Sequence, residues 1–139
     1  HILYDPSLRD VSKTHMGWDN YEYAFSGCEA SVHGEAGRVY AVLRESPARK
    51  LVSLVNLTAS DGCWNKPQKE PEALENIIVT MAVPAEPAEL YAISPETDNG
   101  APQRLSYTLE KRPEGLFISA SLPRLKRWSC LVAEWKEQL

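Results

Sequence analysis

The chain has 139 residues, a net charge of −4 and a hydrophobic fraction of 43%, a composition that fits one globular domain with its own core. The acidic balance, with a sequence pI near 5.4, argues against a nucleic-acid or anionic-membrane partner. No apolar run approaches the ~20 residues needed to cross a bilayer, and no signal peptide is recognisable.

Residues 1–26 are predicted to be an irregular connector from an upstream domain that is missing from this sequence. The Asp5-Pro6 pair disfavours helix, because the residue before a proline is pushed toward extended conformations. The chain starts at His1 with an apolar run, which is typical of a segment cut from a longer protein. Just before Gly27, three aromatic residues alternate with other side chains, and this alternation predicts a strand.

The stretch Lys50–Leu57 is the strongest strand signal in the chain. Five of its eight residues are leucine or valine, and they fall on both faces of a strand. Because strands covered on both sides show such nearly continuous apolar runs, we expect this one at the centre of a sheet. The turn Ser46–Arg49 is too short for a parallel crossover, so it predicts an antiparallel hairpin with Arg38–Glu45.

Further short strands are separated by turn residues along the rest of the chain. The cleanest alternation spans 104–111, with Leu105, Tyr107 and Leu109 predicted to point inward. A hairpin turn follows, in which Gly115 is free to take a positive φ. The predicted strands after Gly27 are 28–33, 38–45, 50–57, 76–83, 89–94, 104–111, 116–122 and 128–135.

These elements predict an all-β fold. It is an antiparallel β-sandwich of Greek-key type with about eight or nine strands, preceded by the connector. The sandwich is assigned to residues 27–139. Residues 123–127 are expected to link the last two strands. Trp128 and Trp135 are seven positions apart, so they should lie on opposite faces of the final strand.

No pattern of catalytic residues is recognisable. No serine has a nucleophile-elbow context, and the seven glycines are scattered at turns, not gathered in a phosphate-binding loop. Paired carboxylates could hydrolyse a glycosidic bond, but the acidic residues near the start lie in the connector, where we expect them to be solvated. We therefore predict no catalytic residue and no cofactor.

The cysteines and histidines are not expected to bind metal. Three cysteines are widely spaced and odd in number, so free buried thiols are favoured over a disulfide. Cys28 and His33 lack a second pair of ligands, which argues against zinc. The other histidines, His1 and His15, lie in the connector and are expected to be exposed or loosely packed.

The loop after the central strand is the one segment with a possible binding role. Trp64 lies there next to Asn65, with Asp61 nearby, and sugar rings stack on exposed aromatic side chains. These three residues are candidate carbohydrate contacts, although packing that anchors the loop is the favoured interpretation of Trp64. The triplet Asn56-Leu57-Thr58 matches the N-glycosylation acceptor, but a buried strand end would hide Asn56.

Several segments together resemble the C-terminal domain of glycoside hydrolase family 66, the dextranases and cycloisomaltooligosaccharide glucanotransferases. The resemblance covers about residues 38–135 and rests on the order and spacing of its motifs. Two departures are the missing arginine after Trp64 and Glu96 in place of the commoner aspartate. The motifs are Leu51–Leu57, Trp64-Asn65, Asn76-Ile77-Ile78-Val79, Ala92-Ile93-Ser94-Pro95-Glu96, Leu105-Ser106-Tyr107 and Leu122–Trp128.

In that family, the catalytic carboxylates belong to a (β/α)8 barrel that precedes the sandwich. The resemblance therefore implies a non-catalytic domain that packs on the barrel of an enzyme acting on α-glucan and stabilises it. It also suggests an extracellular or periplasmic location. No catalytic residue of the family can be transferred to these positions.

Three other functions stay open from the sequence. A carbohydrate-binding module would present exposed, coplanar aromatic residues, with Trp64 as the first. A protein-interaction sandwich would form a stable oligomer through a large apolar patch. An independent enzyme is the least favoured, because no catalytic constellation is present.

Overall fold

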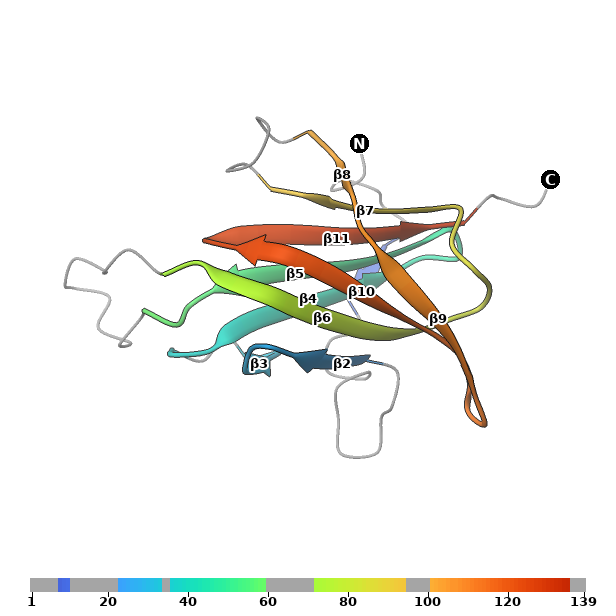
Figure 1. The fold of residues 1–139 in the computed structure, drawn as a ribbon, viewed down its shortest axis with the longest axis horizontal. Helices are drawn as coiled ribbons and strands as arrows, with labels where there is room; N and C mark the ends of the chain where they lie inside the picture. Colours follow the sequence, from blue (N-terminus) through green and yellow to red (C-terminus); the bar gives the residue numbers. More distant parts are fainter. Residues whose placement is uncertain (1–7, 11–22, 34–35, 60–71, 95–100, 136–139) are drawn as a thin grey trace.

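The computed structural model describes residues 8–10, 23–33, 36–59, 72–94 and 101–135. Within these ranges the chain forms two packed β-sheets and no helix (Figure 1). The all-β sandwich predicted from the sequence is therefore confirmed. The described segments include no helix with the length and hydropathy that a membrane span requires.

Seven strands form the first sheet, which we call sheet A. Its main order is β1-β4-β5-β11-β7-β8; all these pairs are antiparallel, and β3 pairs with β4 in parallel. The last strand, β11, thus lies between β5 and β7. The strands of sheet A are β1 (Arg9–Asp10), β3 (Ala30–Ser31), β4 (Val39–Glu45), β5 (Arg49–Asn56), β7 (Glu89–Ile93), β8 (Gln103–Arg104) and β11 (Trp128–Glu134).

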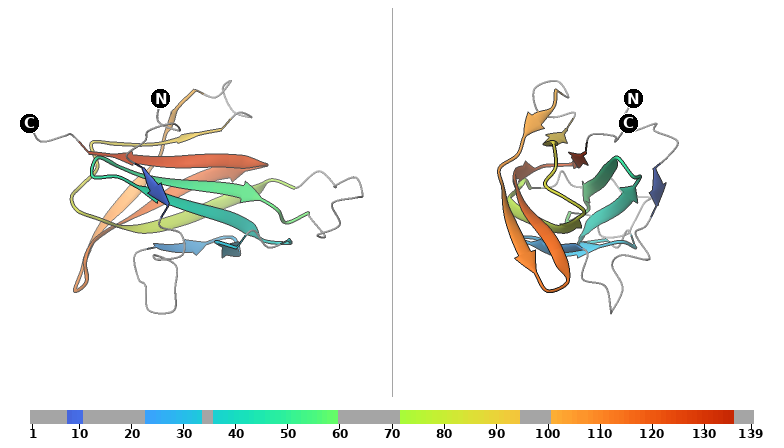
Figure 2. Two further views of the ribbon diagram at one scale, coloured as in Figure 1. Left: turned by 180° about the vertical axis from the view of Figure 1, so that it is seen from behind. Right: turned by 90° about the vertical axis from the view of Figure 1, so that its right-hand side faces the viewer.

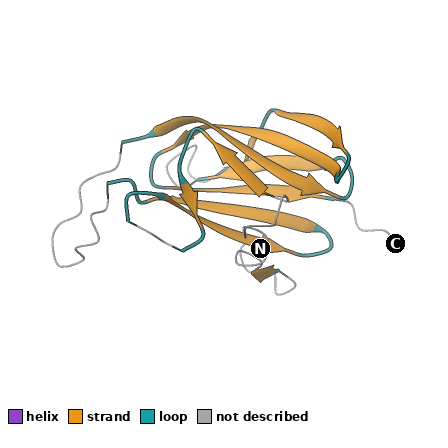
Figure 3. Cartoon of the chain, turned by 90° about the horizontal axis from the view of Figure 1, so that it is seen from below, coloured by secondary structure: helices purple, strands orange, loops and turns teal. Residues whose placement is uncertain are grey.

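The second sheet, sheet B, is antiparallel with the order β2-β6-β10-β9. Figure 2 shows the two sheets facing each other, and Figure 3 shows strands joined only by loops over the described residues. Because β1, β3 and β8 have two residues each, eight longer strands remain in the described ranges, as expected. The strands of sheet B are β2 (Tyr23–Ser26), β6 (Leu74–Val83), β9 (Tyr107–Arg112) and β10 (Gly115–Leu125).

The predicted central strand is confirmed. β5 lies between β4 and β11, and its pairing with β4 is the expected antiparallel hairpin. Val52 and Leu54 face sheet B in the main core, whereas Leu51 faces outward and is equally buried. The strand is thus apolar on both faces because both faces are covered.

The main core fills the space between the sheets. It follows the strict alternation that the sequence shows in β6 and β10, and the residues predicted to share one face of each strand do so. Gly115 has the predicted positive φ, 139°, at the β9–β10 turn. The fully buried members of this core with the largest side chains are Leu43, Leu54, Ile77, Met81, Ile118, Leu125 and Leu131.

The prediction of one strand over 104–111 is wrong. β8 ends at Arg104 and β9 starts at Tyr107, because the chain crosses from sheet A to sheet B between them. Leu105 is buried at this crossing, as expected, but Leu109 is 46% exposed. β9 is the edge strand of sheet B, so Leu109 has a neighbouring strand on one side only.

The prediction that residues 123–127 form a linker is also wrong in part. β10 continues through Pro123 to Leu125, which pairs with Leu74. Asn76, facing Pro123, has a φ of 56°, a left-handed conformation that asparagine tolerates. This kink changes the alternation, so that Leu74 and Leu125 pack into the main core.

The predicted connector contributes two strands to the sandwich. β1 pairs with β4, and β2, the strand expected before Gly27, pairs with β6. Figure 2 shows β1 at the β4 edge of sheet A, on the side away from sheet B. Residues 23–26 are therefore part of the folded domain.

Candidate functional site

The three predicted carbohydrate contacts, Trp64, Asn65 and Asp61, lie outside the described residues, so their role stays a prediction. What the structure describes are the two ends of their loop, where β5 ends at Asn56 and β6 begins at Leu74.

Asn56 holds these two loop ends together. Its side-chain amide donates hydrogen bonds to the carbonyl oxygens of Glu72 (3.0 Å) and Lys126 (2.8 Å). Its Oδ1 accepts from the backbone N–H of Thr58 (3.1 Å) and from the Thr58 hydroxyl (2.5 Å). With 6% of its surface exposed, Asn56 is hidden as expected. Asn56 and Thr58 of the glycosylation motif instead make structural hydrogen bonds that connect the loop ends.

A second apolar cluster covers the outer face of sheet A, which sequence reasoning did not identify as a separate surface. Its fully buried members come from the central strands β5 and β11, and Tyr91 of β7 is 8% exposed. Leu8, from the segment before β1, packs against it. The signal was present in the sequence, since both central strands are apolar at consecutive positions. The cluster comprises Leu51, Tyr91, Cys130 and Val132, with Leu8, Ile93 and Trp128 packed at its border.

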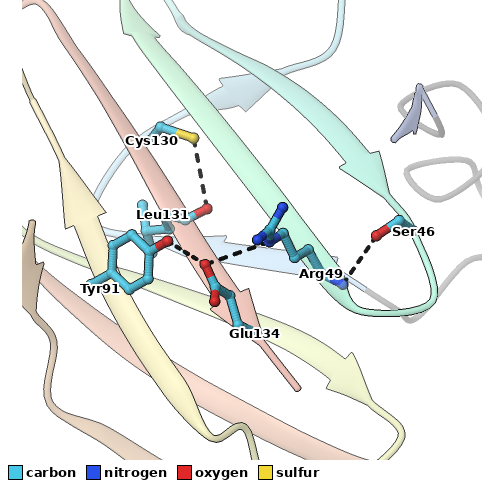
Figure 4. Close-up of polar contacts among 6 residues, drawn as sticks. All are labelled: Ser46, Arg49, Tyr91, Cys130, Leu131 and Glu134. Carbon is cyan, nitrogen blue, oxygen red and sulfur yellow. Dashed lines mark hydrogen bonds and ion pairs between the residues drawn. The ribbon is translucent and has the colours of Figure 1, made fainter. Parts of the chain in front are cut away.

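A polar triad borders this cluster (Figure 4). The hydroxyl of Tyr91 donates a hydrogen bond to Glu134 Oε1, and Arg49 Nε lies 3.5 Å from the same oxygen. Burial, the hydrogen bond to Glu134 and the negative charge of that carboxylate raise the pKa of Tyr91, while Arg49 opposes the shift. The triad connects β7, β11 and β5, so its contacts stabilise sheet A.

A third group of polar side chains joins the two sheets. Lys50 Nζ donates to the carbonyl oxygen of Ala82 in sheet B (2.7 Å) and lies 3.3 Å from Glu45 in sheet A. Tyr23 of sheet B donates to the same carboxylate at 2.7 Å, and its ring lies 5.4 Å from the ammonium. We call this group the inter-sheet clasp.

The described cysteines and histidine show no arrangement for nucleophilic or metal chemistry. Cys28 and Cys130 are free thiols, and burial raises the pKa of both. Cys130 is fully buried and accepts a weak hydrogen bond from Ser53 at 3.4 Å. His33 is exposed. Over the described ranges, no three His, Cys, Asp or Glu side chains gather in a group that could hold a metal ion.

Trp128, at the start of β11, and Trp135, directly after its end, lie on opposite faces, as predicted. Trp128 borders the outer cluster. Trp135 packs against the main core, and its indole N–H donates to the carbonyl oxygen of Ala85 (2.9 Å).

Over the described residues, the chain is a two-sheet sandwich in which the triad, the inter-sheet clasp and Asn56 bond to neighbouring parts of the sandwich. The Glycosyl hydrolase family 66 profile matches residues 4–132. The chain therefore belongs to glycosyl hydrolase family 66.

Among curated relatives, two cycloisomaltooligosaccharide glucanotransferases of Niallia circulans are 30% and 26% identical over 108 residues. These alignments cover 76% of this chain but only 11% of each enzyme.

Among solved structures, a cycloisomaltooligosaccharide glucanotransferase of Paenibacillus sp., complexed with cycloisomaltoheptaose, matches with a TM-score of 0.74 and 22% identity. The match covers 93% of this chain and 18% of that one. An α-L-fucosidase isoenzyme of Paenibacillus thiaminolyticus shares the fold at a TM-score of 0.57 and 12% identity, over 84% of this chain and 16% of that chain.

Proposed function

We propose that this chain is the non-catalytic C-terminal sandwich of a family 66 enzyme that acts on an α-glucan such as dextran. In this proposal the sandwich packs on the catalytic (β/α)8 barrel and stabilises it. The observation that carries the proposal is the contrast in coverage. The family match spans residues 4–132 of this chain, whereas the chain spans only 11% to 18% of the glucanotransferases it resembles.

The internal contacts support a structural role. The buried or half-buried ionisable groups of the triad and the inter-sheet clasp all bond to neighbouring strands. Groups held in this way stabilise the sheets.

The proposal is tested with the full-length enzyme that contains this sandwich and a version that lacks it. Removing the sandwich is expected to lower the melting temperature of the remaining enzyme and to leave the products formed from dextran unchanged. The 139-residue chain by itself is expected to release no sugar from dextran. Measurable hydrolysis by the chain alone would contradict the proposal.

A second candidate function is glucan binding through the Trp64 loop. It is supported by the cycloisomaltoheptaose in the solved glucanotransferase and by the stacking ability of an exposed indole. Affinity electrophoresis on dextran and on starch separates the two functions. Retardation that is lost in Trp64→Ala would establish a binding module, and an unretarded chain would rule it out.

A further inference from the structure

The outer face of sheet A consists of rows of side chains that cross three or four strands. In the register of the sheet, Tyr40, Val55 and Trp128 form one row. The next row runs from Val42 through Ser53 and Cys130 to Ile93. Both rows are apolar or weakly polar. An antiparallel sheet facing water on one side would carry alternating polar residues there, so this face has the composition of a covered surface.

The cover is incomplete within the described chain. The middle of the face is fully buried, but five apolar side chains around it are only half-buried. We call these five the outer patch. They are Tyr40, Val42, Val55, Ile93 and Trp128.

Three donors on this face have no acceptor among the described residues. The Nε of Arg44 is buried without a hydrogen-bond partner, and buried polar atoms are seldom left unpaired. Within the described part of the chain, the hydroxyl of Tyr40 and the indole N–H of Trp128 also lack an acceptor. By contrast, Tyr91 and Trp135 both bond to a neighbour inside the sandwich.

Aromatic side chains with one unsatisfied polar atom, together with arginine, are the residue types enriched at protein–protein interfaces. The opposite face of the molecule differs in the middle of sheet B, where the outward positions Ala24, Thr80, Ser119 and Ser121 are short side chains. Of the two larger apolar residues on that face, Ile78 is half-buried and Phe117 is buried, with the Arg112 guanidinium 4.6 Å from its ring centre. Thr80 and Ser119 hydrogen-bond to each other at 3.0 Å. That face therefore provides an internal control.

The occupant follows from the segment that already lies on this side. Leu8 packs on the outer cluster and β1 extends the same sheet beside β4, so the polypeptide that precedes the sandwich reaches this face. The solved relative is more than five times the length of the matched region, since the match covers 18% of it.

We infer that the outer patch of sheet A is the docking surface for the remainder of the family 66 polypeptide, with Tyr40 and Trp128 as its anchors. Acceptors on that partner surface pair with the hydroxyl of Tyr40 and the indole N–H of Trp128, which are the half-buried donors of this face. This inference rests on the proposed function and specifies which face performs it.

Site-specific cross-linking in the full-length enzyme tests the assignment. The photoreactive residue benzoylphenylalanine replaces Tyr40 in one sample and Ser121, on the outer face of sheet B, in the other. After irradiation, position 40 is expected to give cross-links to peptides outside residues 1–139, in several-fold higher yield than position 121. Cross-links that leave the sandwich from position 121 and not from position 40 would overturn the inference.

A matched pair of substitutions gives a second measurement. Val55→Glu places a charge in the outer patch, and Ser121→Glu places one on sheet B. In the full-length enzyme, Val55→Glu is expected to lower the melting temperature and to speed the proteolytic release of the sandwich. Ser121→Glu should change neither. Equal effects of the two substitutions would contradict the inference.

The two proposals can fail separately. If removal of the sandwich leaves the stability of the enzyme unchanged, the proposed function is wrong. If removal destabilises the enzyme while cross-links from position 40 stay within residues 1–139, the function stands and the docking face is wrong.

Discussion

Leu54 is a single side chain that reports on the whole core. It lies in the middle of β5, faces sheet B and has no exposed surface. Truncating a fully buried leucine removes packing and leaves a cavity, so Leu54→Ala is expected to lower the free energy of unfolding by about 2–5 kcal/mol. Denaturant unfolding measures this loss.

The control is Leu109→Ala, which changes the same side chain where it is 46% exposed and should cost only about 0.5 kcal/mol. Similar losses of unfolding free energy for the two variants would show that Leu54 does not lie in the core.

Asn56 is unusual in using both amide hydrogens and its oxygen in structural bonds. Asn56→Asp keeps the shape but turns two donors into an acceptor that faces the carbonyl oxygens of Glu72 and Lys126. We expect a loss of about 2 kcal/mol or more, because each of these carbonyls loses its donor.

Thr58→Val is the matched control for Asn56→Asp. It removes only the hydroxyl bond to Asn56, and a loss of about 1 kcal/mol is expected. Thermal unfolding of both variants against the parent chain measures the difference. If Asn56→Asp cost no more than Thr58→Val, the two hydrogen bonds donated by the Asn56 amide would contribute no more stability than the single Thr58 hydroxyl bond.

The pKa of Tyr91 is raised by burial and by its bond to Glu134. A raised folded-state pKa stabilises the fold below the unfolded pKa of about 10, and this stabilisation is lost as pH rises through the folded-state value. In an alkaline titration followed by tyrosinate absorbance, Tyr91 should ionise above the ordinary range.

Two substitutions separate these causes. Tyr91→Phe removes that late-ionising component. Glu134→Gln lowers the Tyr91 pKa toward its ordinary value, because the carboxylate charge is gone and only burial and a neutral partner remain. An unchanged titration curve in Glu134→Gln would contradict the assigned cause.

At the scale of elements, the kink in β6 depends on a close approach by Gly27. Gly27 has a φ of 82°, and a Cβ at this position would lie 2.7 Å from the backbone oxygen of Asn76. Gly27→Ala therefore combines backbone strain with a clash against main chain. We expect it to cost more than ~1 kcal/mol, the scale of the strain alone.

Gly37 provides the comparison. Its φ is nearly the same, 83°, but a Cβ there would have nothing within 4 Å. Gly37→Ala should therefore show the strain alone. Equal melting temperatures for the two variants would mean that the contact with Asn76 relaxes freely.

Strands with a regular apolar period were predictable, because alternation reports directly on a covered face. That holds for β4, β5, β6 and the inner face of β10. The crossing at Leu105 was not predictable, since a chain that changes sheets keeps the same local alternation on both sides. The continuation of β10 through Pro123 was hidden for the opposite reason, because proline normally marks the end of a strand.

At the scale of the whole molecule, the contacts that hold the two sheets together join residues far apart in sequence. The inter-sheet clasp brings Lys50 to Ala82, and Asn56 reaches Lys126. No local sequence pattern predicts contacts between residues so far apart in the chain. The polar triad, the inter-sheet clasp and the outer patch were therefore recognisable only in the structure. The candidate loop around Trp64 illustrates the reverse case, where sequence alone supplies the hypothesis.

The position of β11 has a consequence for how the chain is made. Sheet A is complete only when β11 has inserted between β5 and β7, and β11 is the last strand of the described chain. During synthesis β5 and β7 therefore each keep an open edge of unpaired backbone N–H and C=O groups until β11 has been made. Non-local pairing of this kind folds slowly and exposes strands to aggregation. Under the docking proposed for the outer patch, a part of the polypeptide that folds before the sandwich would act as a template on which these strands assemble.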